Sequence, residues 1–312
     1  MLSKLVKSSV VVALAATAAC ASGHGGSHDY NAQAEKDRKA LVKYFEDKFA
    51  DPHKNKDTFF PYSTDDELKN NIIAGLKHND FAQGNYAFSE NGRVSYEELK
   101  EMPPYEELVE KGEEIFEGNA ALKKCFPDTT IGGDYPYYFQ ERQQVVTLTQ
   151  AINECLVNAG QKKLKTSKGT MAFIQAYISQ QTQDAEKNVN IKIESKEAAE
   201  AYERGKKYYY SERGYLKLSC ATCHVQGAAQ RVRNESLSQL LGHTTHFPVY
   251  RLKWGKGKVE NGLGTLERRM GGCIKDQGQN PPKATSNDMK DLLYFMAYMS
   301  NGMPVDGPDL RK

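Results

Sequence analysis

The segment Cys220-Ala221-Thr222-Cys223-His224 has the Cys-x-x-Cys-His pattern of covalent c-type haem attachment. Two thiols on one helical turn can reach the two vinyl groups of a haem, and the adjacent imidazole is then delivered to the iron. A redox dithiol or half of a zinc site would also contain the two cysteines, but a zinc site needs a second ligand pair at short spacing, which the sequence lacks. We therefore expect Cys220 and Cys223 to hold one haem c and His224 to be an axial ligand.

The haem motif lies in the second of two similar units. Each unit has a helix with an internal glycine, a loop cysteine, a Thr-Leu pair, a second cysteine and a closing helix with an Ala-Tyr-x-Ser sequence. These landmarks are Gly112, Cys125, Thr147-Leu148, Cys155 and Ala176-Tyr177-Ile178-Ser179 in the first unit, and Gly205, Cys220, Thr265-Leu266, Cys273 and Ala297-Tyr298-Met299-Ser300 in the second. Landmarks in the same order predict a tandem duplication, with an insertion between the two landmark cysteines of the second unit.

Composition and patterning indicate a mostly α-helical globular protein. The chain has 312 residues, a mass of 35.0 kDa, 39% hydrophobic residues and a net charge of +2. These values exclude a multispanning membrane protein, a collagen-like repeat and a fully disordered chain, and they give no strong field for nucleic acid. Long β patterns are missing from the sequence. We predict two tandem cytochrome c-like domains with long loops, at residues 105–190 and 191–312, and haem only in the second.

The N-terminus predicts export to the periplasm. Two lysines precede the short apolar run at residues 10–18, and small residues follow it, which is typical of a signal peptide ending near residue 21. The run is too short to form a stable membrane span. Cys20 also weakly resembles the lipidated cysteine of a lipoprotein. Residues 22–104 are interpreted as a flexible start and an N-terminal extension, with a helix at residues 34–49; His24 and His28 are better explained as a solvated tail than as metal ligands.

The first unit lacks the groups that attach haem. Asp128 and Thr129 occupy the places of the second cysteine and the histidine of the motif. Cys125 and Cys155 remain, and in an oxidising compartment two such cysteines most simply form a disulfide. Closing a loop of about 30 residues contributes roughly 3.5 kcal/mol, which replaces part of the core that a lost haem once supplied.

The duplication also nominates Cys273 as the sixth ligand of the iron. If Cys155 lies close to Cys125, then Cys273, which matches Cys155, should lie close to the haem. Thiolate ligation lowers the potential of the iron and the pKa of the cysteine. A buried unreactive thiol is the simpler alternative, and His243 and His246 are rival axial ligands.

Basic residues around Cys273 point to an anionic ligand. Residues 225–275 contain nine Lys or Arg and three Glu, a formal charge of +6, although the whole chain carries only +2. Arg268 and Arg269 precede the cysteine, whereas the first unit has Gln150 and Ala151 at their places. Arg269 is four residues before Cys273, which is one helical turn, so we predict that Arg269 binds the anion.

The haem motif, the segment Arg269-Met270-Gly271-Gly272-Cys273 and the haemless first unit together resemble SoxA, the larger subunit of the SoxAX cytochromes. The resemblance extends from about residue 35 to the C-terminus. Many members of this family carry haem in both units. The present sequence departs from that form and resembles the single-haem variety.

The resemblance implies an enzyme, L-cysteine S-thiosulfotransferase. It would join thiosulfate to a cysteine of the SoxY carrier protein, within the SoxYZ complex, and two electrons would pass through the haem to the SoxX cytochrome. Cys220 and Cys223 would hold the haem, with His224 as one axial ligand. Cys273 would be the other axial ligand and the catalytic sulfur, as a persulfide, and Arg269 would hold the thiosulfate dianion.

Two other classes of function remain open from the sequence. One is a plain periplasmic electron-transfer cytochrome, in which replacing Arg269 would leave function intact. The other is a docking subunit whose partner performs the catalysis, in which Cys273→Ser would alter only the haem spectrum.

Overall fold

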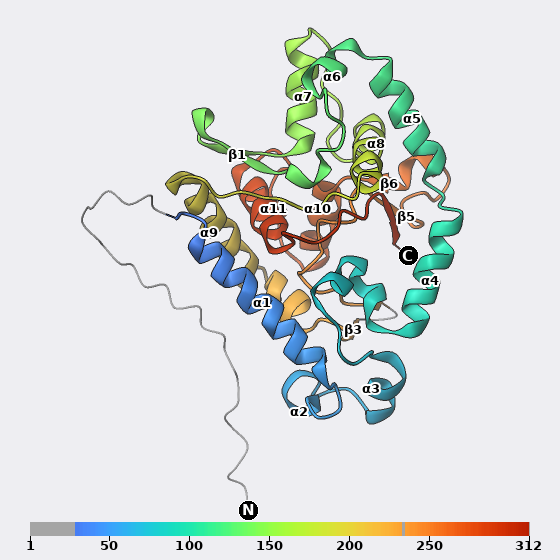
Figure 1. The fold of residues 1–312 in the computed structure, drawn as a ribbon, viewed down its shortest axis with the longest axis vertical. Helices are drawn as coiled ribbons and strands as arrows, with labels where there is room; N and C mark the ends of the chain where they lie inside the picture. The colour runs from blue at the N-terminus through green and yellow to red at the C-terminus, as the bar shows by residue number, and fades with distance from the viewer. Residues whose placement is uncertain (1–28, 233–234, 312) are drawn as a thin grey trace, which may run out of the picture.

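The computed structural model describes residues 29–232 and 235–311 and is mostly helical, which confirms the predicted fold class (Figure 1). The predicted signal peptide, Cys20, His24 and His28 lie outside the described residues. Within the described residues, no helix is long and apolar enough to cross a membrane.

The two units contain the same series of helices, in the order that the duplicated landmarks predict. In the first unit they are α5 (Glu106–Glu117), α6 (Ala120–Cys125), α7 (Leu148–Asn158) and α8 (Thr170–Asp184), with the antiparallel strands β1 (Tyr137–Phe139) and β2 (Gln144–Val146). In the second they are α9 (Lys196–Tyr210), the π-helical turn η4 (Thr222–Gln226), α10 (Leu266–Asp276) and α11 (Asn287–Met299).

A glycine in each unit allows its first and last helices to cross in close contact. A Cβ at Gly112 of α5 would lie 2.0 Å from the backbone oxygen of Phe173 in α8. A Cβ at Gly205 of α9 would lie 2.0 Å from the backbone oxygen of Asp291 in α11. Both distances are far below van der Waals contact, so only glycine fits either crossing. The shared geometry supports a common origin for the two units.

The insertion expected in the second unit forms short strands. The hairpin strands β3 (Arg231–Val232) and β4 (Glu235–Ser236) come first. Then β5 (Val249–Arg251) pairs antiparallel with β6 (Leu263–Gly264) and parallel with the C-terminal strand β7 (Asp309–Arg311). The single turn η5 (Val259–Asn261) connects β5 to β6. This sheet fixes the segment that leads into α10.

The N-terminal extension packs against the haem-motif unit. It contains α1 (Ala32–Ala50), α2 (Lys56–Phe59), α3 (Asp65–Asn71), η1 (His78–Phe88) and α4 (Glu90–Glu101). The helix predicted at residues 34–49 is α1, which runs alongside α9 (Figure 1). Asp37 of α1, buried at 5% exposure, accepts hydrogen bonds from Lys206 at 2.5 Å and from Tyr202 at 3.0 Å, both in α9. These bonds attach the extension to the second unit.

The apolar cores follow the division into units only in part, because one cluster joins Ala172 and Phe173 of α8 to Tyr250 of β5. Phe45 and Phe49 of α1 belong to one continuous cluster with Tyr209 of α9 and Met296 of α11. The first unit has a separate cluster around Phe116, which includes Cys155. The extension and the second unit therefore share a core.

Candidate functional site

The second unit contains a partly open cavity next to the haem motif. Cys220, His224, Arg269 and Cys273 all line it, so the structure brings together four residues that the sequence places up to 53 positions apart. The rest of the lining is largely apolar and aromatic. Its residues are Tyr209, Ser238, His243, His246, Phe247, Leu266, Met270, Ile274, Gln277 and Met296.

The turn that carries the haem motif is fixed at its start by two side chains. The Thr222 N–H donates to the Ser219 hydroxyl at 3.1 Å, and the Ser219 N–H donates to the Thr222 hydroxyl at 3.2 Å. This reciprocal pair satisfies two backbone donors at the beginning of the turn. It sets the direction in which Cys220, Cys223 and His224 leave the backbone.

The imidazole of His224 is oriented for a metal. Its Nδ1 lies 2.8 Å from the carbonyl oxygen of Ser238, which can only accept, so Nδ1 carries the proton and Nε2 keeps its lone pair. Burial lowers the pKa of His224 to about 4, which keeps the ring neutral. A neutral imidazole with a carbonyl partner on Nδ1 is the usual form of a histidine ligand.

The two thiols of the motif are not joined to one another. Cys220 is buried and Cys223 is half-buried, and neither is in a disulfide. Burial raises the pKa of Cys220 to about 12 and raises that of Cys223 as well. Two thiols, one histidine with its Nε2 lone pair available and a largely apolar cavity lined by Cys220 and His224 fit a covalently attached haem.

The corresponding region of the first unit has a different covalent structure. Cys125 and Cys155 form a disulfide with a Cα–Cα distance of 6.2 Å, as the sequence predicts. The disulfide borders an apolar cluster with Phe116, Ile152 and Ile178. Packed side chains and a disulfide thus stabilise the unit that lacks the attachment motif.

Helix α10 presents Arg269 and Cys273 to the cavity from consecutive turns. The hydroxyl of Thr265 caps the helix by accepting from the Arg268 N–H at 3.4 Å. One further turn along, the amide of Gln277 donates to the Cys273 sulfur at 3.5 Å. Sequence analysis missed Gln277, although its spacing of four from Cys273 repeats the spacing between Arg269 and Cys273.

Arg268, next to Arg269, has a structural role. Its guanidinium donates to the carbonyls of Asn261 at 2.8 Å and Leu263 at 3.2 Å, and lies 3.9 Å from the ring centre of Trp254. These contacts attach the insertion to α10. The two neighbouring arginines therefore differ, and Arg269 is the one that lines the cavity.

The two rival histidines also line the cavity, but they have different partners. The ring of His243 lies 4.4 Å from that of His224, and its Nε2 is 2.9 Å from the Ser238 hydroxyl. His246 bonds through Nδ1 to the Gly242 carbonyl at 3.1 Å. Sequence analysis also missed Ser238, which holds both His224 and His243.

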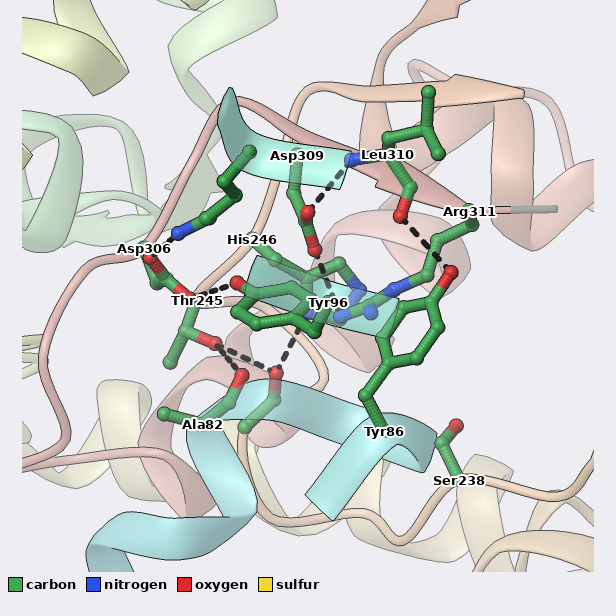
Figure 2. Close-up of polar contacts among 12 residues, drawn as sticks. Ala82, Tyr86, Tyr96, Ser238, Thr245, His246, Asp306, Asp309, Leu310 and Arg311 are labelled. Carbon is green, nitrogen blue, oxygen red and sulfur yellow. Dashed lines mark hydrogen bonds and ion pairs between the residues drawn. The ribbon is translucent and has the colours of Figure 1, made fainter. Parts of the chain in front are cut away.

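A polar network of the C-terminal segment surrounds His246 (Figure 2). Arg311 forms an ion pair with Asp309 at 2.9 Å, and its guanidinium lies 4.7 Å from the ring centre of Tyr86. Asp306 accepts hydrogen bonds from Tyr96 and Lys100 of α4. Burial and the positive charge of Arg311 keep the pKa of His246 well below its usual value. The network ties the C-terminal segment to the extension beside the cavity.

Comparison with known proteins gives the family. The model of the SoxA/TsdA cytochrome c domain matches residues 111–186 and 204–305. Two proteins named "L-cysteine S-thiosulfotransferase subunit SoxA" are similar to this chain over 76% of its length. The one from Chlorobaculum tepidum is 42% identical and is covered over 82% of its own length, and the one from Allochromatium vinosum is 36% identical and is covered over 84%. The chain belongs to the SoxA family. The SoxA fold also appears in the crystal structure of SoxXA from P. pantotrophus, with 28% identity, a TM-score of 0.61, and coverage of 70% of this chain and 84% of that chain.

Membership of the SoxA family confirms the resemblance that the motifs indicated. The family model describes a cytochrome c domain, and such domains bind haem c covalently. The expected enzyme class is confirmed at the level of the family, because its curated members are named as subunits of L-cysteine S-thiosulfotransferase.

Proposed function

We propose that this SoxA chain oxidises thiosulfate in the periplasm by joining it to a cysteine of the SoxY carrier protein, within SoxYZ. The domain organisation would be a signal peptide at residues 1–21, an extension at 22–104, a haemless unit at 105–190 and a unit with the single haem at 191–312. The observation that carries the proposal is the position of Arg269 and Cys273, one helical turn apart in the cavity that His224 and Cys220 also line.

The reaction joins two sulfur atoms and releases two electrons and one proton. Thiosulfate is a dianion, and the guanidinium of Arg269 suits it because it offers several N–H donors in a fixed plane. Cys273 would carry the reacting sulfur, as a persulfide and as the second axial ligand. Gln277, which donates to the Cys273 sulfur, stabilises negative charge there. Cys220, Cys223 and His224 would hold the haem, whose chemistry in this site is to accept the electrons.

The proposed partners follow from the charge and from the relatives. A heterodimer with the SoxX cytochrome is supported by the structural neighbour, which is described as SoxXA. The nine Lys or Arg and three Glu of residues 225–275 suit a region that meets an anionic substrate. The signal-peptide pattern supports the periplasm as the compartment.

Replacing Arg269 tests the anion-binding role. We expect Arg269→Ala to lower the rate of thiosulfate-dependent conjugation of SoxYZ by about 10- to 100-fold, the loss of a charged hydrogen-bond donor. Lys275→Ala is the matched control, because it removes one positive charge from an exposed position of the same helix. Haem absorbance of both variants checks that the site is intact. An Arg269→Ala protein with the full rate would contradict the role.

A plain electron-transfer cytochrome is the alternative. His246 favours it, because this imidazole lines the cavity and could be an axial ligand in place of Cys273. The rate at which the Cys273→Ser variant conjugates thiosulfate to SoxYZ distinguishes the two functions. The sulfur-transfer proposal predicts that conjugation is abolished, whereas retention of the rate would favour electron transfer or catalysis by a partner.

A further inference from the structure

A fully buried lysine connects the N-terminal extension to the haem-motif turn. Lys48 of α1 has 0% of its surface exposed. Lysine is almost never fully buried unless a carboxylate accompanies it. Within residues 29–232 and 235–311, no carboxylate forms an ion pair with Lys48, and the ring centre of Phe60 lies 4.9 Å from its amine. Burial lowers the pKa of this amine to about 7. Burying an amine without a carboxylate partner costs free energy, so the hydrogen bond of this amine must explain why position 48 is a lysine.

The amine of Lys48 donates to the backbone carbonyl of Gln226 at 2.9 Å. Gln226 is the last residue of η4 (Thr222–Gln226), the turn that contains Cys223 and His224. Carbonyls at the end of a helical segment lack partners within it, and a cationic side chain there is favourable for the local dipole. Lys48 therefore caps the end of the haem-motif turn from a helix 178 residues away in sequence.

The other attachments of the turn hold its start and His224, and none of them bonds the Gln226 carbonyl in place of Lys48; the His224 carbonyl itself accepts from the Leu240 N–H at 2.8 Å. The start of the turn is held by the Ser219–Thr222 pair, and the His224 ring is held by the Ser238 carbonyl. Without the bond to Gln226, the end of the turn that follows His224 loses its contact with α1. The Gln226 carbonyl, two residues after His224, would then lose the bond that fixes the end of the turn.

The docking of α1 does not itself require Lys48. Asp37, Lys206 and Tyr202 already join α1 to α9 through a buried ion pair and a hydrogen bond. An apolar side chain of similar length at position 48 would satisfy the surrounding aromatic core without burying a charge. The lysine is thus needed for its contact with Gln226 and not for the interface as a whole.

We propose that Lys48 is a positioning residue for the haem ligand: by holding the Gln226 carbonyl, it fixes the turn that delivers His224 to the iron. The inference rests on the proposed attachment of haem at Cys220 and Cys223. It gives the N-terminal extension a role in setting the electronic properties of the haem. The role is separate from substrate binding, which the proposed function assigns to Arg269.

Two lysines that bond α1 to the second unit, the buried Lys48 and the partly buried Lys206, allow a matched experiment. Lys48→Met removes the amine that reaches the haem-motif turn, whereas Lys206→Met removes an amine that pairs with Asp37 and does not contact the turn. The full-length protein with its haem is used for both variants. The measurements are the electron paramagnetic resonance spectrum of the ferric haem, its midpoint potential and the free energy of unfolding in urea.

We expect Lys48→Met to shift the midpoint potential and the resonance signals of the haem, although the protein folds. We expect Lys206→Met to lose stability, because it leaves the buried carboxylate of Asp37 without its ion-pair partner, and to keep the wild-type haem signals. Wild-type signals in Lys48→Met would overturn the proposal. Equal shifts in both variants would also overturn it, because the effect would then belong to the docking of α1.

The outcome is independent of the proposed sulfur chemistry. The Lys48 experiment reads the haem alone, so its failure leaves the expected rate loss of Arg269→Ala standing. Conversely, a full rate in Arg269→Ala would contradict the substrate role and leave the spectroscopic prediction for Lys48 unchanged.

Discussion

At the scale of single residues, buried polar atoms determine which groups reach the cavity. Ser238 binds His224 through its carbonyl and His243 through its hydroxyl, so one residue sets the tautomer of the first ring and occupies Nε2 of the second. Neither bond has a signal in the sequence, because a serine 14 positions from a histidine has no characteristic pattern. Local spacing, in contrast, was sufficient to predict Cys220, Cys223 and His224.

Lys48 gives a pH dependence of stability at this scale. Its pKa is about 7 in the folded protein and about 10.4 in an unfolded chain, so the unfolded state binds more protons between these values. The contribution of this residue to the free energy of unfolding therefore rises as pH increases through that window. Between pH 7 and pH 9 we expect the free energy of unfolding of wild type to increase by up to about 3 kcal/mol relative to that of Lys48→Met.

Urea unfolding of both proteins at pH 7 and pH 9 measures this gain. Subtracting the change in the free energy of unfolding of Lys48→Met from that of wild type removes the contribution of the other groups that titrate in this range. A difference that stays constant with pH would show that Lys48 remains charged in the folded protein.

At the scale of elements, the glycine crossings explain why two divergent units keep one architecture. We expect Gly112→Ala and Gly205→Ala each to lower the free energy of unfolding by about 3 kcal/mol, because the new Cβ meets a backbone oxygen that cannot move without separating the helices. Only the second change should also alter the haem spectrum.

Gly271→Ala is the control for the glycine prediction. Gly271 lies within α10, and a Cβ there would meet no other atom within 4 Å. Its replacement should raise stability by up to about 1 kcal/mol, as alanine is the better helix former and its Cβ would meet no neighbour. Comparable losses at Gly271 and Gly205 would contradict the crossing argument.

The disulfide stabilises the first unit in the way that haem attachment would stabilise the second. Removing it in Cys125→Ala/Cys155→Ala should cost roughly 3.5 kcal/mol, because a loop of about 30 residues is no longer closed in the unfolded chain. Calorimetry of the double variant measures the loss. Haem content and the haem spectrum should be unchanged, and their loss would show that the disulfide also supports the haem site of the second unit.

At the scale of the whole molecule, the sequence predicted the relation between the units better than the place of the extension. The duplication correctly placed Cys273 in the same cavity as Cys220, because matched landmarks carry long-range information. The contacts of Lys48 with Gln226 and of Asp37 with Lys206 join segments more than 160 positions apart, and no repeat or motif relates them. The sequence could not predict the contact of Gln277 or the different roles of Arg268 and Arg269, because these depend on the direction in which each side chain leaves α10.

The central claim is that the second unit alone carries haem and that Cys273 carries the reacting sulfur. Peptide-mapped mass spectrometry of the unreduced protein tests both parts in one measurement. The account predicts one haem on the peptide with Cys220 and Cys223, a crosslink between Cys125 and Cys155, and an additional sulfur atom on Cys273. A Cys273 disulfide to Cys125 or Cys155, or a peptide with Cys220 and Cys223 that lacks haem, would contradict it.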